Sequence, residues 1–320
     1  MKIINKIDLP LKEEVTLTIG SFDGIHIGHQ YVINKCVEIA KTTYTQSLIY
    51  TFEPHPKIVI PYDGFKLLTV LKEKLFILKN FEIDFLYIQE FNKDFANLQP
   101  SEFLKILFKN FGIKNFVIGY DNRFGKDRRG DFDFLLNISK ENNFNLIRLE
   151  QILYKNQKVK STQIRRLIHD GRIEEANNLL GYPYIIYGQI EKGLGLGKKI
   201  GYPTLNLKYY NYKLYPPNGV YFSLTLLKNV FYKSLLYIGK RPTFMQNNVN
   251  ITIENYLLNY DNFSPVEELF VFVFKYFRPD IKFENADDLR RQIEIDIRMC
   301  ENFFKNITLE RNIFITKKFS

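Results

Sequence analysis

The chain has 320 residues, of which 45% are hydrophobic and 25% charged, and this composition excludes a disordered chain as the default. The formal net charge is +10 at pH 7, and the length predicts roughly two domains. No apolar run reaches about 18 residues and the first residues, MKIINKIDLPLKEE, contain no uninterrupted signal core, so we expect a cytoplasmic protein with no membrane partner.

The first half of the chain alternates short apolar runs with helical patterns. Strands are expected at residues 15–19, 47–52, 85–90, 115–120 and 145–150, and helices at 29–41, 70–81, 101–111 and 132–143. Strands that alternate with helices are typical of a parallel sheet with right-handed crossovers. We therefore expect an α/β domain over residues 1–182.

The second half has a different order of predicted elements, with strands following one another directly. Strands are expected at residues 184–193, 219–227, 230–239, 251–258 and 269–278, and a helix follows at 286–305. Consecutive strands without helical crossovers indicate an antiparallel barrel or sandwich. The sequence thus predicts a β-rich domain over residues 183–320, closed by a helix.

The turn between the first strand and the first helix, Gly20 to Gly28, reads GSFDGIHIG. A helix N-terminus offers free backbone N–H groups and the positive end of the helix dipole, which suits phosphate. His26 and His29 are three residues apart and share a face if they are helical. A metal site is the alternative, but no third ligand is close in sequence and helix N-termini repel cations.

This turn resembles the ATP site of the nucleotidylyltransferase superfamily, whose His-x-Gly-His signature reads His26-Ile27-Gly28-His29 here. Three further segments extend the resemblance: FEPHP (52–56), GYDNRFGKDRRGD (119–131) and STQIR (161–165). Together they are similar to the FMN adenylyltransferase module of bacterial FAD synthetases, which has a Rossmann-like fold.

The resemblance implies roles for individual residues. His26, His29 and Arg165 would stabilise the reacting phosphates. Residues implied to bind ATP or flavin are Gly20, Phe22, Asp23, Gly28, His55, Asp121, Arg123, Ser161 and Thr162. Asn122 stands where the family usually has an aromatic residue.

A second glycine-rich stretch, GLGLGKKIGYPTLN, spans residues 193–206. It lacks the GxxxxGK[ST] pattern of a Walker loop and follows an antiparallel-type strand, which argues against a dinucleotide fingerprint. Thr204 and Asn206 are two residues apart and would share one face of an extended segment. Their neutral oxygens fit Mg²⁺, which takes few protein ligands and keeps sites for water and phosphate.

This stretch is similar to the Pro-Thr-x-Asn motif of riboflavin kinases. Segments in that family's order follow it: GVYFS (219–223), IGKRPTF (238–244), IENYLLNY (253–260) and FRPDIKF (277–283). Glu254 falls where the family places its catalytic carboxylate. Residues implied to bind substrate are Gly193, Gly197, Lys198, Gly201, Pro203 and Arg278. Lys198 stands where the family often has Arg, and Tyr256 where it commonly has His.

The combined resemblance implies a bifunctional riboflavin kinase/FAD synthetase that uses ATP and Mg²⁺ to convert riboflavin to FMN and FMN to FAD. One alternative is a chain that keeps only one of the two activities. Another is a nucleic-acid-binding protein that uses the net charge of +10. The lysines are scattered rather than clustered, so we expect no nucleic-acid partner. The oligomeric state is left open.

Overall fold

The computed structural model describes residues 1–60, 64–193, 196–241, 250–260 and 267–305. It divides into two compact units. The first joins Met1–Phe65 with Lys74–Lys160, and the second joins Lys66–Glu73 with the described part of Ser161–Ser320. Among the described residues, no helix combines the length and the hydropathy that a membrane span requires.

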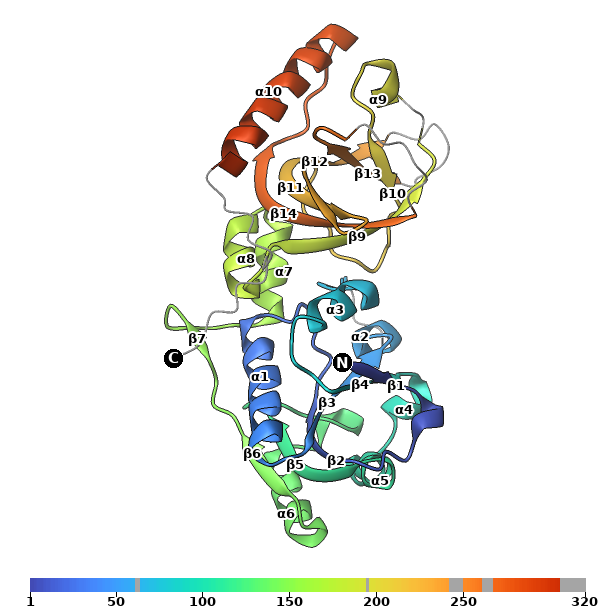
Figure 1. The fold of residues 1–320 in the computed structure, drawn as a ribbon, viewed down its shortest axis with the longest axis vertical. Helices are drawn as coiled ribbons and strands as arrows, with labels where there is room; N and C mark the ends of the chain where they lie inside the picture. Colours follow the sequence, from blue (N-terminus) through green and yellow to red (C-terminus); the bar gives the residue numbers. More distant parts are fainter. Residues whose placement is uncertain (61–63, 194–195, 242–249, 261–266, 306–320) are drawn as a thin grey trace. The chain divides into compact units, whose positions relative to one another are not determined.

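The first unit is built on a six-stranded sheet in which every neighbouring pair is parallel, in the order β1-β4-β3-β2-β5-β6 (Figure 1). Its strands are β1 (Lys2–Ile4), β2 (Glu14–Ile19), β3 (Gln46–Glu53), β4 (Phe85–Glu90), β5 (Gly112–Ile118) and β6 (Asn145–Arg148). The chain winds from β2 through β3 to β4 on one side and from β5 to β6 on the other. The strand order therefore reverses between β2 and β5, and ligands of open parallel sheets bind at the carboxyl ends of such strands.

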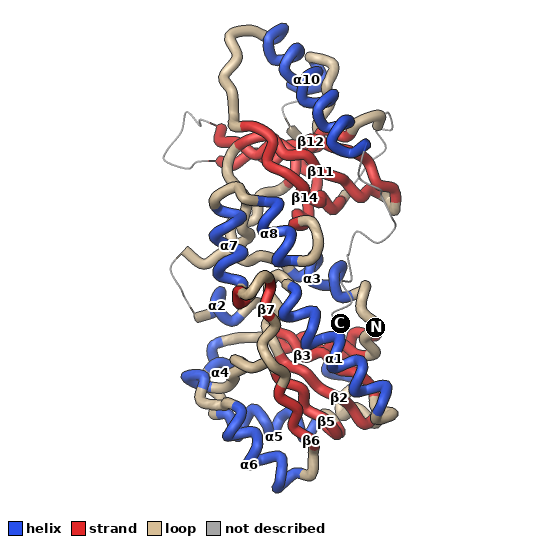
Figure 2. Tube along the Cα trace, turned by 90° about the vertical axis from the view of Figure 1, so that its left-hand side faces the viewer, coloured by secondary structure: helices blue, strands red, loops and turns tan. Residues whose placement is uncertain are grey.

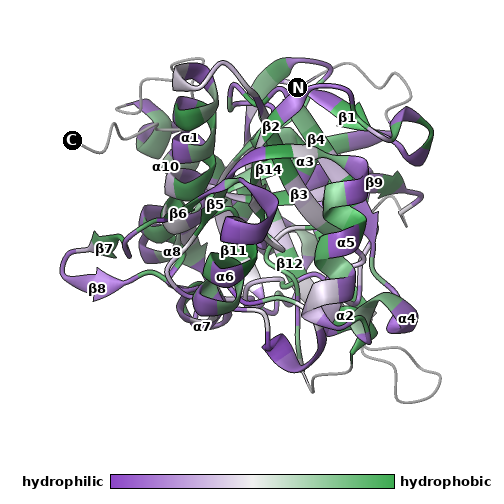
Figure 3. Ribbon diagram, turned by 90° about the horizontal axis from the view of Figure 1, so that it is seen from below, coloured by the Kyte–Doolittle hydropathy of each residue, from purple (hydrophilic) through white to green (hydrophobic). Residues whose placement is uncertain are grey.

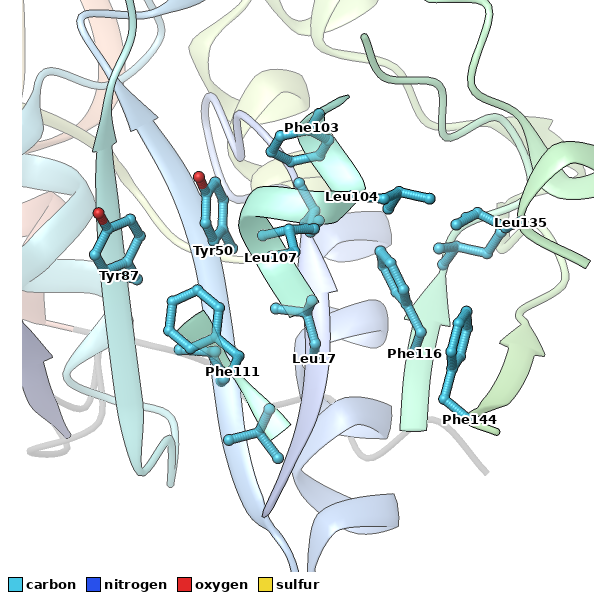
Figure 4. Packing of buried hydrophobic residues seen from close by; sticks show 14 of the residues in the cluster. Leu17, Tyr50, Tyr87, Phe103, Leu104, Leu107, Phe111, Phe116, Leu135 and Phe144 are labelled. Carbon is cyan, nitrogen blue, oxygen red and sulfur yellow. The ribbon is translucent and has the colours of Figure 1, made fainter. Parts of the chain in front are cut away.

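Helices cover both faces of this sheet. The helices that contact its strands are α1 (Ile27–Thr42), α5 (Pro100–Asn110) and α6 (Phe132–Asn142), and α3 (Leu71–Leu78) lies between β3 and β4 in the chain. In Figure 4, α5 presents Phe103, Leu104 and Leu107 to the strands while α1 runs behind them. Figure 3 shows α1 alternating between hydrophobic and hydrophilic segments, as expected for a helix with one face on a sheet. The predicted α/β layers are confirmed.

Several helix starts have a local cause. Pro100 begins α5, and the backbone N–H of Gln99 donates to the Glu102 side chain in a capping box. Asp131 caps α6 by accepting from the backbone N–H of Phe134 at 3.1 Å. The short elements of the chain are the 3-10 turns Lys6–Asp8 and Lys126–Arg128, the helices α2 (Pro56–Val59), α4 (Lys93–Ala96) and α9 (Leu196–Lys199), and the hairpin β7 (Leu153–Tyr154) and β8 (Gln157–Lys158).

The second unit contains a closed antiparallel barrel, in the order β10-β13-β12-β11-β14-β9 (Figure 2). Its strands are β9 (Tyr184–Glu191), β10 (Leu205–Leu207), β11 (Gly219–Leu227), β12 (Val230–Arg241), β13 (Asn250–Leu257) and β14 (Glu268–Arg278). The long helix α10 (Ala286–Lys305) packs on the barrel, with Phe303 against Phe222 and Phe304 against Phe274. The predicted barrel and its closing helix are confirmed.

The units divide the chain at residue 160, whereas the sequence placed a boundary at residue 182. Two helices, α7 (Ser161–His169) and α8 (Ile173–Leu180), group with the barrel. The cause is Asn177, whose amide donates to Val273 O at 3.0 Å and accepts from the backbone N–H of Tyr184 at 2.8 Å. These bonds join α8 to β14 and β9. A division of the two catalytic modules at residue 182 stays a prediction.

Residues 66–73 also group with the barrel unit, although they lie in the first half of the sequence. The backbone of Leu67 exchanges hydrogen bonds with Tyr212 and Leu214. A buried ion pair adds to this contact: Lys213 Nζ lies 2.6 Å from Glu73 Oε2, and both side chains are at most 1% exposed. Lys213 Nζ also donates to Leu68 O and Ile185 O, and Glu73 Oε1 accepts from the backbone N–H of Tyr187. The two opposite charges contact each other and both form further hydrogen bonds to the backbone, and these contacts offset the cost of removing the charges from water.

Candidate active sites

The turn after β2 is compact and largely buried. The backbone N–H of Gly20 donates to Tyr50 O at 3.0 Å, which ties the end of β2 to β3. A side chain at Gly20 would meet the Phe22 ring at 2.9 Å, so glycine is required there by close approach. The backbone then reverses through positive φ angles at Phe22 and Gly24. After this sharp turn the chain enters α1.

His26 is the N-cap of α1 rather than a helical residue, and its Nδ1 accepts a hydrogen bond from the backbone N–H of His29 at 3.3 Å. The two imidazole rings stack with their centroids 3.7 Å apart. Because Nδ1 of His26 is the acceptor, the neutral ring carries its proton on Nε2 and can donate from that atom. The expectation of two histidines on one helical face is replaced by two stacked rings at the helix N-terminus.

A second loop leaves the sheet next to this turn, because β5 pairs with β2. The Asn122 amide in that loop donates to Ile19 O, the last carbonyl of β2, at 3.0 Å. Asp121 and Arg123 flank Asn122 and are both exposed. Asn122 therefore has a structural role that the sequence did not suggest. Its hydrogen bond holds the 119–131 loop against β2, the strand that precedes His26.

Buried charges beside the same turn were missed by sequence reasoning. Lys74 is 2% exposed, and its Nζ donates to Thr51 Oγ1 at 3.3 Å, while the Thr51 hydroxyl donates to Ser21 O at 3.4 Å. Burial lowers the pKa of Lys74, and the carboxylates of Glu53 and Asp23 oppose that shift. Burial also raises the pKa of Glu53. A lysine in a helical KEK segment gives no sequence signal of such burial.

His55 caps the short helix α2. Its Nδ1 accepts from the backbone N–H of Lys57 at 3.1 Å, and its ring stacks on Phe65 with centroids 5.0 Å apart. Only 7% of His55 is exposed. The residue therefore has a local structural role as a cap, and its expected contact with a substrate stays a prediction.

The STQIR segment forms the first turns of α7 in the second unit. Ser161 is the first residue of the helix and Thr162 the next. The Arg165 guanidinium donates from Nε to Lys66 O at 2.7 Å, within the same unit. That contact fixes the side chain of Arg165, and its role toward phosphate stays a prediction.

A pocket of ≈ 210 Å³ opens in the second unit, and it collects most of the second predicted site. The predicted residues that line it are Gly193, Gly197, Lys198, Pro203, Thr204 and Asn206. Two glycines are required by close approach: a Cβ at Gly193 would lie 2.1 Å from Asn206 Nδ2, and one at Gly197 would lie 2.3 Å from Tyr202 O. Gly201 has a φ of +87°, which lets the chain turn after α9.

The predicted carboxylate lies next to the predicted metal ligands. The Thr204 hydroxyl donates to Glu254 Oε2 at 3.0 Å. Asn206 in β10 is paired directly with Glu254 in β13 and, on its other side, with Glu191 in β9. Directly paired residues of neighbouring strands present their side chains on one face of the sheet. Glu191, which also lines the pocket, is a second carboxylate that sequence reasoning missed.

Arg278 has a different environment from the one expected. Its guanidinium contacts Asp296 of α10, with Nη2 2.6 Å from Oδ2, and Nη1 donates to Pro279 O. The two side chains are 14% and 3% exposed. Arg278 therefore anchors α10 to β14, and substrate binding by this residue stays a prediction.

The two sites differ in the side-chain donors that they offer to a metal ion. Within the described part of the chain, no group of three or more His, Cys, Asp or Glu residues could hold a metal ion. The oxygens of Thr204, Asn206 and Glu254 form a hard donor set suited to Mg²⁺.

Comparisons with known proteins agree with the division of the chain into two domains. A family model described as FAD synthetase matches residues 9–163, and one described as riboflavin kinase matches residues 180–304. A crystal structure of a protein named as a macrolide-efflux protein, from Streptococcus pneumoniae, is similar with a TM-score of 0.82 and 29% identity, and the match covers 94% of this chain and 98% of that chain.

Curated relatives match along nearly their whole length. The bifunctional riboflavin kinase/FMN adenylyltransferase of Buchnera aphidicola subsp. Schizaphis graminum is 32% identical over 295 residues, which cover 91% of this chain and 94% of the relative. The protein of the same name from Listeria monocytogenes is 31% identical, with 91% and 93% covered. The chain therefore belongs to the family of bacterial bifunctional riboflavin kinase/FMN adenylyltransferases and carries both of its enzymatic domains.

Proposed function

We propose that the pocket of the second unit phosphorylates riboflavin and that the turn at the start of α1 in the first unit contributes to adenylyl transfer to FMN. The observation that carries the kinase assignment is the hydrogen bond from Thr204 to Glu254, with Asn206 on the same face of the barrel. The reactions are riboflavin + ATP → FMN + ADP and FMN + ATP → FAD + diphosphate.

The kinase step needs a group that manages a proton, because its nucleophile is the terminal hydroxyl of the ribityl chain. Glu254 accepts or orients that proton as the oxygen attacks the γ-phosphate of ATP. Thr204 holds one carboxylate oxygen of Glu254, which fixes the rotamer of the base. Lys198 contributes positive charge to the phosphates, and Gly193 and Gly197 allow them to approach the backbone.

Mg²⁺ accompanies ATP in this proposal, with Thr204 and Asn206 as its protein ligands. The Thr204 hydroxyl directs its proton to Glu254, so the oxygen lone pairs remain for a cation. When bound, the ion neutralises charge on the phosphate oxygens. The protein residues then serve to position the hydroxyl nucleophile and to keep the carboxylate in reach of it.

The adenylyl-transfer step has other needs. The FMN phosphate is largely a dianion at pH 7, since its second pKa is about 6, so it attacks without a protein base. Charge accumulates instead on the α-phosphate and the leaving diphosphate, and hydrogen-bond donors stabilise it. The α1 N-terminus, His26 and His29 supply those donors in this proposal.

The test is to incubate the pure protein with riboflavin, ATP and Mg²⁺ and to separate the flavins by chromatography. FAD as the end product supports both assignments. Accumulation of FMN alone would mean that adenylyl transfer is lost and only the kinase is retained. No product from riboflavin, together with no FAD from added FMN, would overturn the proposal.

A further inference from the structure

Four polar side chains form a hydrogen-bonded chain inside the barrel: Ser223, Thr225, Ser234 and Asn255. Each is 0% exposed. Asn255 Nδ2 donates to Thr225 Oγ1 at 2.7 Å, Thr225 Oγ1 lies 2.8 Å from Ser234 Oγ, and Ser234 Oγ lies 2.8 Å from Ser223 Oγ. A connected polar chain in an apolar barrel interior fixes the orientation of its members.

The donor and acceptor roles in this hydrogen-bonded series are determined by Ser223, at its far end from Asn255. Ser223 Oγ donates its single proton to Ser234 O at 3.0 Å, because a carbonyl oxygen can only accept. Ser234 Oγ must then donate to Ser223, and Thr225 Oγ1 must donate to Ser234. Thr225 is left to accept from Asn255. The amide of Asn255 is therefore held with Nδ2 toward Thr225 and with Oδ1 turned away from it.

Oδ1 of Asn255 is buried and has no hydrogen-bond partner among the described residues. A buried amide oxygen without a partner is unfavourable, and native proteins rarely leave one without a reason. Asn255 lines the same pocket as Gly193, Gly197 and Lys198. The series of hydroxyls thus ends in an oriented hydrogen-bond acceptor on a residue that lines the pocket.

We infer that Asn255 Oδ1 accepts a hydrogen bond from an N–H or O–H group of the nucleotide bound in this pocket. The inference rests on the proposed function, which assigns the pocket to the ATP of the kinase reaction. ATP carries two kinds of donor that fit, the adenine amino group and the ribose hydroxyls. Asn255 acts in binding and selection of the nucleotide, whereas Glu254, its neighbour in β13, acts on the flavin hydroxyl.

The experiment compares wild type and Asn255→Leu, which has a similar volume, in riboflavin phosphorylation. The nucleotides are ATP, purine riboside triphosphate, 2′-deoxy-ATP and 3′-deoxy-ATP, so each analogue lacks one donor. We expect the variant to raise the KM for ATP about 2- to 10-fold, the effect of one hydrogen bond, and to leave the KM for riboflavin unchanged. The analogue that lacks the bonded donor should bind wild type and variant equally well.

Two further variants make the result specific. Thr225→Val removes the anchor of the Asn255 amide without altering a pocket-lining residue, and it should raise the KM for ATP in the same direction by a smaller factor. Ile253→Val is the matched control, because Ile253 is 1% exposed, lies two residues away in β13 and does not line the pocket. Its KM for ATP should equal that of wild type. Thermal unfolding of the full chain reports on folding of each variant.

The outcomes separate the inference from the proposed function. Equal discrimination among all four nucleotides by wild type and Asn255→Leu would overturn the inference and would mean that a buried water satisfies Oδ1. A change in the KM for riboflavin alone would also overturn it. If instead Thr204→Val and Glu254→Gln both phosphorylate riboflavin as wild type does, the assignment of the pocket itself fails.

Discussion

The Thr204 hydroxyl donates a hydrogen bond to Glu254 Oε2 at 3.0 Å, and this bond joins a segment after the glycine-rich loop to the central part of β13. The two residues are 50 positions apart in the chain. A hydrogen bond to a carboxylate is about twice as strong as one between neutral groups. Thr204 and Glu254 should therefore behave as one functional unit rather than as two independent contributors.

Thr204→Val keeps the shape of the side chain and removes the hydroxyl. We expect riboflavin phosphorylation to fall about 10- to 100-fold, because a hydrogen bond to a charged group is lost. Thr204→Ser, which keeps the donor, is the control and should retain most of the rate. Steady-state kinetics with ATP and riboflavin give the comparison, and equal rates for the Val and Ser variants would rule out a role for the hydroxyl.

Glu254→Gln removes the negative charge but keeps the size. The rate of riboflavin phosphorylation should fall about 10²- to 10⁴-fold, the range of general-base catalysis, while FAD formation from FMN is unchanged. In the double variant with Thr204→Val, the second substitution should add little, since both remove the same oriented base. Full kinase turnover by Glu254→Gln would show that another group manages the proton.

His29→Ala tests the first unit in the opposite direction. Its ring stacks on His26 at the start of α1, where donors would stabilise charge on the phosphates. FAD formation from FMN should fall about 10²- to 10³-fold, as for the loss of one transition-state donor, and phosphorylation of riboflavin should persist. The measurement is the FMN-to-FAD ratio from riboflavin over time. A folded variant that loses both activities equally would contradict the assignment of the two sites.

The motifs that define both sites could be predicted from the sequence, because they depend on local spacing. Thr204 and Asn206 are two residues apart; Asn206 lies in β10 and pairs with Glu254, and Thr204, just before β10, donates to Glu254. The alternation of strands and helices likewise predicted the parallel sheet. The strand β10 itself was not predicted, since three residues are too few to show a period of two.

The residues that the sequence did not predict depend on distant partners. The amide of Asn255 is oriented by Thr225 on β11, and the buried Lys213 is paired with Glu73. Neither position has a local pattern that distinguishes it from an exposed polar residue. The assignment of residues 66–73 to the barrel unit has the same origin, because backbone hydrogen bonds of Leu67 with Tyr212 and Leu214 act together with the buried ion pair.

Asp296→Asn should destabilise the second unit without changing any residue that we assign to either reaction. The carboxylate is 3% exposed and holds Arg278, so its loss leaves a guanidinium largely buried without its counter-charge. The expected loss in unfolding free energy is about 3 kcal/mol. Thermal unfolding of the full chain with and without the substitution gives the value, and Asp287→Asn, at an exposed helix start, is the control. Equal midpoints for the two variants would show that the pair adds no stability.

The two cysteines should be inert in the folded protein. Cys36 and Cys300 are both 0% exposed, and burial raises the pKa of each thiol to about 12. The thiolate is the reactive form, so at pH 8 only about one thiol in 10⁴ is ionised, and reagents also lack access. A colorimetric disulfide reagent at pH 8 should therefore titrate no thiol in the native enzyme and both after unfolding in guanidinium. Rapid reaction of either cysteine under native conditions would mean that α1 or α10 opens readily and exposes it.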